Sequence, residues 1–214
     1  MQTSFKKEWP LLLLVAVPFA YLGAIWNDLP EQVPLHWNLQ GEIDRWGSRS
    51  ELWLIPVVTT LLIYLLLLII PMIDPKKRLA EMGAKYARLK LLMVAAMSAL
   101  AVVILHMTHR GGPVSATPVL VVVGLLITVL GNYMKTVRPN YFIGIRTPWT
   151  LESPEVWNKT HQLAGKLWFL GGLLMVAVAL FLKGAAQFGL VLGIALAITL
   201  IPLVYSFLVY RRAS

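Results

Sequence analysis

The sequence predicts an all-α polytopic membrane protein with six transmembrane helices and both termini in the cytoplasm. Three observations predict it: an excess of apolar residues, six long stretches without charge, and an uneven distribution of Lys and Arg. Hydrophobic residues make up 58% of the 214 residues against about 45–50% in a soluble domain, and charged residues 14% against about 25%. A chain of this size has too little core volume to hide so much apolar surface from water, which excludes a soluble globular protein. The high hydrophobicity also excludes a disordered chain.

Six stretches lack Asp, Glu, Lys and Arg and approach the ~20 apolar residues that cross a ~30 Å hydrocarbon layer. They are Trp9–Asn27, Leu52–Ile73, Leu91–Met107, Thr117–Met134, Leu167–Leu182 and Phe188–Tyr210. The fifth has only 16 such residues, but Lys166 and Lys183 flank it and can extend their amines to the two surfaces. Each stretch is therefore expected to span the membrane as a helix.

Lys and Arg are concentrated on one side of the predicted membrane, where 15 of the 19 lie. These are Lys6, Lys7, Lys76, Lys77, Arg78, Lys85, Arg88, Lys90, Lys135, Arg138, Arg146, Lys159, Lys166, Arg211 and Arg212. The other side has Arg45, Arg49, Arg110 and Lys183, whereas the ten acidic residues divide evenly. Because cytoplasmic segments carry the excess of Lys and Arg, both termini are expected to be cytoplasmic. The net charge of +9 then reflects topology and anionic lipid head groups, and not nucleic-acid binding.

The polar side chains inside the predicted spans are few, and none is Asp, Glu, Lys or Arg. Ion-coupled transporters keep ionisable groups near the membrane midplane despite a cost of at least ~2.5–3.5 kcal/mol each. A proton-driven pump or an ion channel is therefore disfavoured. Gly189 and Gly193 form a GxxxG pair, which favours close helix packing within the chain over a dimer seam.

The loop Asp28–Glu51, on the predicted outer side, is expected to form a compact cap on the membrane surface. Two prolines and two glycines interrupt it at short intervals, which argues against a long helix or strand. Its apolar residues are nevertheless too many for a free linker. Within it, Asn38–Gly41 is predicted to form a turn in which Gly41 takes a positive φ angle.

The loop Lys135–Lys166, on the predicted inner side, is longer than the ~12–15 residues beyond which loops tend to be functional or disordered, and it is too apolar for disorder. Ser153, Pro154 and Glu155 predict a helix start, with Ser as the N-cap and Pro at the first helical position. The following apolar residues recur at helical spacing, so this helix is expected to continue into the fifth span. Before it, Asn140–Leu151 is expected to lie in or near the head-group layer.

Both loops carry motifs that resemble those of the SdpI-type family of bacterial membrane proteins. The outer motif is Leu29-Pro30, Val33-Pro34, His36-Trp37-Asn38, Gly41, Asp44 and Trp46-Gly47-Ser48. The inner motif is Asn140, Gly144-Ile145-Arg146-Thr147-Pro148-Trp149-Thr150-Leu151, Val156-Trp157, Thr160-His161 and Gly165. We accordingly divide the chain into an N-terminal two-helix unit, residues 1–75, and a four-helix unit, residues 76–214.

The resemblance implies that the protein protects its cell against a secreted, membrane-active peptide toxin. It also implies that the inner face binds a transcriptional repressor, and that the protein lies in the bacterial cytoplasmic (inner) membrane. Candidate contacts are His36, Trp37, Asn38, Asp44 and Trp46 outside, and Asn140, Arg146, Thr147, Trp149, Trp157 and His161 inside. Membrane lipids are the other expected partners, and no direct contact with nucleic acid is expected.

The histidines allow two chemical alternatives. His106 and His109 share a helix face, and with His36 or a carboxylate they could complete a zinc or copper site. The outer carboxylates Glu42 and Asp44 could instead pair with the neighbouring arginines. On the inner side, His161 beside Glu152 or Glu155 could act as a general base, although hydrogen bonding to the loop is the simpler role. No nucleophile with a positioned base is apparent, so we expect neither a cofactor nor an enzyme.

Arg146 lies in an apolar stretch, where an unpaired guanidinium is costly. It is expected to pair with Glu152 or Glu155, to stack on Trp149 or Trp157, or to contact water, a phosphate or a partner protein.

Three function classes remain. The first is an immunity and signal-transducing membrane protein. The second is a transporter or exporter of an apolar or peptide substrate, which the uncharged interior disfavours. The third is a membrane enzyme or metal-binding protein, which the sparse set of candidate residues disfavours.

Overall fold

The computed structural model describes residues 5–75 and 77–213. Among them, six helical segments are long and apolar enough to cross a membrane: Glu8–Asp28, Arg49–Ile73, Ala84–Arg110, Thr117–Met134, Pro154–Phe181 and Gly184–Arg212. Each corresponds to one of the six predicted spans, so the expected all-α polytopic architecture is confirmed. Of the basic residues used for the orientation, Lys76 and the side chains of Lys6 and Lys7 lie outside the described part.

The elements follow one another along the chain with a small hairpin between the first two spans. They are α1 (Phe5–Ile25), η1 (Trp26–Asp28), β1 (Gln32–Trp37), β2 (Ile43–Ser48), η2 (Arg49–Trp53), α2 (Leu54–Pro56), η3 (Val57–Leu61), α3 (Leu62–Ile73), α4 (Arg78–Glu81), α5 (Ala84–Arg110), α6 (Thr117–Met134), α7 (Pro148–Glu152), α8 (Pro154–Phe181) and α9 (Gly184–Ala213).

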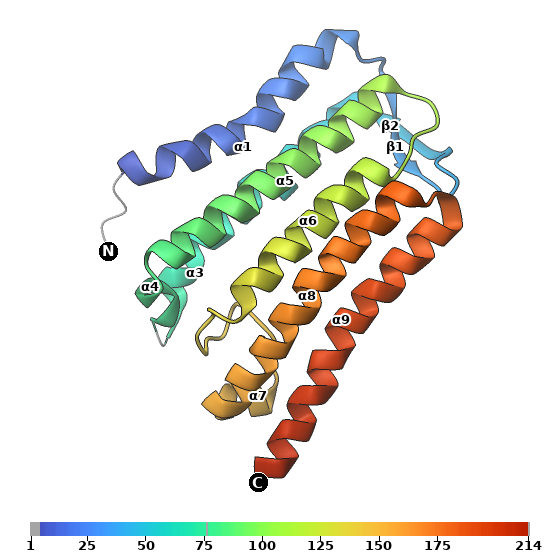
Figure 1. Cartoon of the computed structure of the whole chain (residues 1–214). Coiled ribbons are helices and arrows are strands. Elements are labelled where there is room, and N and C mark those ends of the chain that lie inside the picture. Colours follow the sequence, from blue (N-terminus) through green and yellow to red (C-terminus); the bar gives the residue numbers. More distant parts are fainter. Residues whose placement is uncertain (1–4, 76, 214) are drawn as a thin grey trace.

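The long helices form an open row (Figure 1). Helices α1, α5, α6, α8 and α9 follow one another across it, and α3 lies behind α5. The hairpin β1–β2 lies at one end of the bundle, and the two ends of the chain lie at the opposite end. Helix α6 packs most extensively on α8, whereas α5 packs on α1 and on the second span. The division at residue 75 stays a prediction.

The second span, which contains Pro56, includes a local change of helix type. After Pro56 the chain continues as a π-helical turn, η3, before it resumes an α-helix as α3. Thr59 Oγ1 donates to the carbonyl of Ile55 at 2.6 Å, and Thr60 Oγ1 donates to that of Pro56 at 2.7 Å. Side-chain hydroxyls thus satisfy the backbone in this turn, as a membrane-embedded helix requires.

The third span is longer than predicted. Helix α5 begins at Ala84 and not at Leu91, so Lys85, Arg88 and Lys90, which precede the predicted span, are also helical. Lys90 is also buried. The periodic apolar pattern continues through this basic stretch with Tyr86 and Leu89, both buried on one face of the helix.

An ion pair joins the first and third spans at the ends that lie away from the hairpin. Lys90 Nζ lies 2.6 Å and 2.8 Å from the two carboxylate oxygens of Glu8. The side chains are only 7% and 13% exposed, and Tyr64 of α3 donates a hydrogen bond to the same carboxylate at 3.3 Å. Glu8 and Lys90 each immediately precede a predicted span, which is why the search for charges within the spans missed them.

Glycines let α6 and α8 approach each other closely. A Cβ at Gly131 would lie 2.3 Å from the backbone nitrogen of Phe169, and one at Gly172 would lie 2.5 Å from that of Thr128. Real side chains never come so close to backbone atoms, so larger residues there would force the helices apart. The contact recurs because the glycines on each helix are spaced by seven residues, Gly124 and Gly131 on α6, and Gly165 and Gly172 on α8.

The expectation that Gly189 and Gly193 pack within the chain is wrong. A Cβ at either position would meet nothing within 4 Å, because both residues lie on an exposed face of α9. The spacing of a GxxxG pair predicts that a close contact is allowed, but it does not specify which neighbour is present.

The outer loop contains no long strand, but it forms a hairpin of two six-residue strands that its prolines and glycines did not indicate. Strands β1 and β2 pair antiparallel, with Gln32 opposite Ser48 and Trp37 opposite Ile43. The register is irregular after Pro34, where a residue without an N–H is tolerated at a bulge. Hydrophobic packing explains the hairpin, since Val33 is fully buried in a cluster with α1 and α5.

Breaking the buried ion pair is expected to destabilise the fold. Lys90→Met leaves the Glu8 carboxylate buried without its partner, which costs about 3–5 kcal/mol for pairs of this kind. The thermal unfolding midpoint of the detergent-purified protein should fall markedly. Lys159→Met is the matched control, because its ion pair with Glu155 has the same 2.6 Å length but both side chains are at least half exposed. An equal fall in the two variants would refute a special role for the buried pair.

Candidate functional site

Asn38 organises the tip of the outer hairpin. Its Oδ1 accepts hydrogen bonds from the backbone N–H groups of Gln40 and Glu42 at 2.9 Å and 3.0 Å, and its Nδ2 donates to the Glu42 carboxylate. Gly41 has φ +82°, so the predicted Asn38–Gly41 turn is confirmed. The asparagine therefore fixes the turn itself.

The hairpin tip rests on the loop between α5 and α6. The backbone N–H of Val114 donates to the carbonyl of Gly41 at 2.9 Å, and Trp37 Nε1 donates to the carbonyl of Gly112 at 3.2 Å. A Cβ at Gly41 would lie 2.1 Å from the carbonyl oxygen of Val114, so this close contact requires glycine. Trp37 and Gly41 thereby attach the outer motif to the start of α6.

The outward side of the hairpin carries an exposed polar and aromatic surface. His36 Nδ1 lies 2.6 Å from Asp44 Oδ1, with the two side chains 66% and 43% exposed. Trp46 is 56% exposed, although its ring is large and apolar. We call His36, Asp44 and Trp46 the outer surface. Exposed aromatic groups of this kind are suited to contact another molecule.

The expected arginine partners of the outer carboxylates are not those observed. Asp44 bonds to His36 and Glu42 to Asn38, whereas Arg45 faces Glu51 at 3.6 Å. Arg49 instead donates to the carbonyl of Leu29 and lies over the ring of Trp26.

The three outer histidines do not meet. His106 bonds to the hydroxyl of Tyr21 at 2.9 Å, away from the His36–Asp44 pair. In the described part of the chain no three His, Asp or Glu side chains are placed to hold a metal ion. The zinc or copper alternative with His36, His106 and His109 thus finds no support from the geometry.

Asn140 organises the first part of the inner loop in the same way as Asn38 organises the hairpin. It is 1% exposed, and its Oδ1 accepts from the backbone N–H groups of Phe142 and Ile143 at 2.8 Å and 2.7 Å. Its Nδ2 donates to the carbonyls of Arg138 and Ile143. Every polar atom of this buried amide is used, so Asn140 holds the loop in a fixed turn.

The short helix α7 is capped by threonines and anchored to α9. Thr147 is its N-cap, and Thr147 and Thr150 accept hydrogen bonds from each other's backbone N–H groups. Trp149 Nε1 donates to Ser206 Oγ at 2.7 Å, and its ring packs against Phe207 with centroids 5.4 Å apart. Thr147 and Trp149 therefore position the inner motif on the last span.

Trp157 and His161 fasten the loop to the start of α8. Helix α8 begins as predicted, with the Ser153 hydroxyl accepting from the N–H of Val156, and continues into the fifth span. Trp157 is fully buried and donates to the carbonyl of Val137 at 2.8 Å. The His161 ring stacks on Trp157 with centroids 4.0 Å apart.

The hydrogen bonds of His161 define its protonation. Nδ1 lies 2.8 Å from the Trp157 carbonyl, which can only accept, so Nδ1 carries the hydrogen. Nε2 lies 3.0 Å from the backbone N–H of Ile145, which can only donate, so Nε2 is unprotonated. The ring is therefore neutral, and hydrogen bonding to the loop, the simpler of its two expected roles, is confirmed.

Arg146 is exposed and does not form the expected ion pair. Its Nη1 donates to the backbone carbonyl of Tyr141, and Glu155 is paired with Lys159 instead. None of the ion pairs formed by residues 5–75 and 77–213 includes Arg146. Its guanidinium thus stands at the surface of a rigid loop with most of its donors available.

Sequence reasoning missed several residues that position these loops. Thr150 donates a hydrogen bond to the carbonyl of Ile145. Ser206, on α9, accepts a hydrogen bond from Trp149 Nε1. Gly144, at φ +110°, leaves room for His161, because a Cβ there would lie 2.3 Å from Nε2. The proximity of Gly144 to a histidine 17 positions later has no local sequence signal.

Replacing His161 is expected to loosen the inner loop. His161→Phe keeps a ring against Trp157 but leaves the N–H of Ile145 without its acceptor, at a cost of about 1–3 kcal/mol. Amide hydrogen exchange at Ile145 and protease cleavage within residues 138–147 should both become faster. The control His109→Phe, at the other end of the bundle, should change neither rate. An unchanged exchange rate at Ile145 in the His161 variant would contradict the assigned contact.

Two family models match the chain, and each covers one of the two loops. The SdpI/YfhL protein family matches residues 136–206, which include the inner loop and α8, and DUF1648, a domain of unknown function, matches residues 13–60, which include the hairpin. The immunity protein SdpI of Bacillus subtilis is 26% identical over 178 residues, covering 82% of this chain and 83% of that protein. An uncharacterized protein of Archaeoglobus fulgidus is 38% identical over 58 residues, covering 27% of this chain and 32% of that protein. No solved structure matches the chain.

The family match falls on the loop that Asn140, Thr147, Trp149, Trp157 and His161 hold in place, and the relative from Bacillus subtilis extends the similarity over most of the chain. With its six membrane-length helices, the chain is therefore similar to the SdpI-type family of multi-pass bacterial membrane proteins.

Proposed function

We propose that this chain is a membrane immunity protein that protects its cell against a membrane-active peptide toxin. The observation that carries the proposal is its similarity over 82% of its length to the immunity protein SdpI. The proposal gives the protein no catalytic role. The arrangement of His161 supports this, because the lone pair that a general base needs already accepts the N–H of Ile145.

The outer surface is the proposed contact for the toxin. A membrane-active peptide is amphipathic, so its receptor needs an apolar group beside polar ones at the membrane boundary. Trp46 supplies the apolar ring, and the His36–Asp44 pair supplies polar atoms. The attachment of the hairpin to Gly112 and Val114 keeps these side chains in one arrangement without a partner.

The inner loop is the proposed contact for a cytoplasmic repressor. Arg146 presents unpaired guanidinium donors on a loop that the buried Asn140 and Trp157 hold rigid. A planar guanidinium suits a carboxylate on a protein partner, because it can donate two parallel hydrogen bonds. Repressor binding at this loop would place signalling on the face opposite to the toxin contact.

The orientation that this proposal needs has both termini in the cytoplasm. The 15-to-4 distribution of Lys and Arg supports it. The hairpin lies at one end of the bundle and the inner loop at the other, so one orientation fixes the side of both (Figure 1).

Reporter fusions test this topology. A reporter that is active only outside the cytoplasm should work when fused after Asn38 and should be silent after Ser153 or Ser214. A cytoplasm-only reporter at the same three positions is the control and should give the inverse pattern. Activity of the first reporter at Ser153 would overturn the orientation and, with it, the assignment of both contact surfaces.

A survival assay tests the immunity. Expression in a sensitive host should raise survival against the membrane-active peptide encoded beside the gene of this protein. Trp46→Ala should reduce the protection because it removes the exposed ring, whereas Arg146→Ala should leave protection intact and abolish recruitment of the repressor to membranes. Equal amounts of each variant in the membrane fraction are the control.

No protection by well-expressed wild-type protein would contradict the immunity proposal. Protection that depends on energy-driven efflux of the peptide from membrane vesicles would instead support the exporter alternative. Loss of protection by Arg146→Ala, with Trp46→Ala unaffected, would exchange the roles proposed for the two faces.

A further inference from the structure

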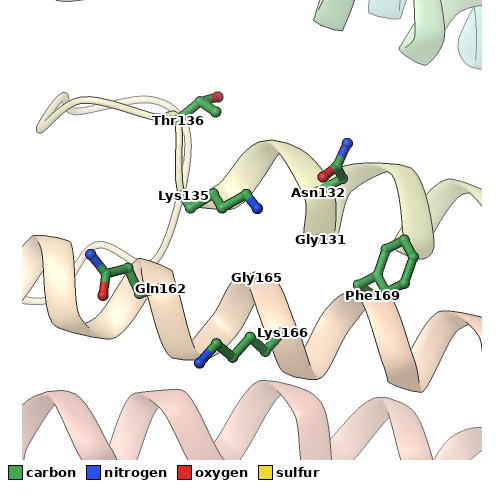
Figure 2. Close-up of a pocket in the computed structure, with 8 residues that line it drawn as sticks. All are labelled: Gly131, Asn132, Lys135, Thr136, Gln162, Gly165, Lys166 and Phe169. Atoms are coloured by element: carbon green, nitrogen blue, oxygen red, sulfur yellow. The ribbon is translucent and has the colours of Figure 1, made fainter.

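A groove with two lysines runs between α6 and α8 at the end of the bundle that carries the termini (Figure 2). Its volume is about 760 Å³, and the residues that form its walls include Gly131, Lys135, Gln162, Lys166 and Phe169. None of the proposed contacts for a toxin or a repressor lines it. The groove is therefore distinct from the outer surface and from the part of the inner loop around Arg146.

The fold makes this groove by ending one helix before the other. Helix α6 ends at Met134, whereas α8 extends well beyond that level because it starts at Pro154 in the inner loop. At the floor the helices nearly touch, since a Cβ on Gly165 would lie 2.9 Å from the carbonyl oxygen of Gly131. The side chains of the two walls stand on either side of this contact.

The two lysines have no carboxylate partner. Lys135 comes from the α6 wall and Lys166 from the α8 wall, and both are exposed. Among the described residues, no ion pair or hydrogen bond involves either side-chain amine, whereas the neighbouring Arg138 and Lys159 are paired with Glu81 and Glu155. No acidic residue lines the groove. The groove is thus lined by two positively charged residues and no negatively charged one, an arrangement that an anion would stabilise.

The groove changes from polar to apolar along its length. Gln162 and Thr136 lie at one end, and Phe169 lies toward the other, where α8 continues as the fifth span (Figure 2). Phe169 is 41% exposed and the adjacent Leu170 63% exposed, on a segment that is apolar enough to face lipid. A ligand that fits both ends has an anionic group attached to hydrocarbon.

We propose that this groove is a binding site for an anionic phospholipid, with Lys135 and Lys166 holding the head-group phosphate. Gln162 and Asn132 add amide donors for the remaining oxygens, and the acyl chains lie along Phe169 and Leu170 toward the membrane interior. The geometry favours a lipid over a free phosphate ion, because a soluble ion would leave the apolar end of the groove unused. The proposal depends neither on the immunity function nor on which side of the membrane this end faces.

Lipid retention tests the site. The purified protein is reconstituted in nanodiscs with equal amounts of phosphatidylglycerol and phosphatidylcholine, then transferred to detergent, and the lipid that remains bound is measured by native mass spectrometry. Wild-type protein should retain phosphatidylglycerol in clear preference. Lys135→Gln with Lys166→Gln should reduce that preference roughly tenfold, because each lysine at an anionic surface contributes several-fold to binding.

The control replaces two other exposed basic residues of the same end of the bundle, Lys85→Gln with Arg88→Gln, and should retain the wild-type preference. Lys135→Arg with Lys166→Arg should also retain it, and this variant detects any loss caused by misfolding. The proposed site would be contradicted if the wild type and the Gln variant showed the same preference for phosphatidylglycerol. It would also be contradicted if the groove variant and the control variant lost this preference equally. If inorganic phosphate stabilised the protein against heat as much as phosphatidylglycerol does, the assignment of a lipid would be wrong and the ligand would be a soluble phosphate.

Discussion

The close contact between α6 and α8 is the constraint on which the rest of the C-terminal half depends. Four glycines, two on each helix, bring the backbones so near that a Cβ at Gly131 would collide with the main chain of Phe169. In lipid there is no hydrophobic force between helices, so packing of this kind is a main source of their association. It places the start of α8 beside the end of α6, where Trp157 can reach the carbonyl of Val137. The inner loop closes over that junction, and the groove of Lys135 and Lys166 opens beside it.

The N-terminal half is stabilised by a different kind of interaction, a buried ion pair. Its first and third spans meet through the buried pair of Glu8 and Lys90, with Tyr64 of the second span bonded to the same carboxylate. Two charges out of water are costly, and only their short contact and the added hydrogen bond offset that cost. Such a pair specifies which helices meet better than apolar packing does, because any other arrangement leaves a charge unpaired. Close glycine packing thus orders one half of the bundle, and a charge pair orders the other.

The sequence predicts elements well where the signal is local. The six spans, the Ser153 helix start and the Asn38–Gly41 turn depend on composition, capping and turn chemistry, and all three are confirmed. The contacts between elements are different. Nothing near Lys90 in the chain indicates Glu8, nothing near Gly144 indicates His161, and the GxxxG spacing pointed to Gly189 although the close helix contact is at Gly131 and Gly165. The hairpin has no comparable local signal, because the burial of Val33 that favours it depends on tertiary packing against α1 and α5.

The two motif loops are stabilised in the same way. In each, an asparagine side-chain amide fixes a turn, and a tryptophan donates a hydrogen bond from the loop region to another segment. In the hairpin, Asn38 forms the turn and Trp37 donates to Gly112. In the loop before α8, Asn140 forms the turn and Trp157 donates to Val137. The two tied segments are the ones that flank α6, since residues 111–116 precede that helix and Val137 follows it. Helix α6 is itself fixed along its length by glycine contacts with α8, and Gln187 of α9 bonds to Thr117 at its start. The hairpin and the inner loop are therefore attached at the two ends of one helix, α6.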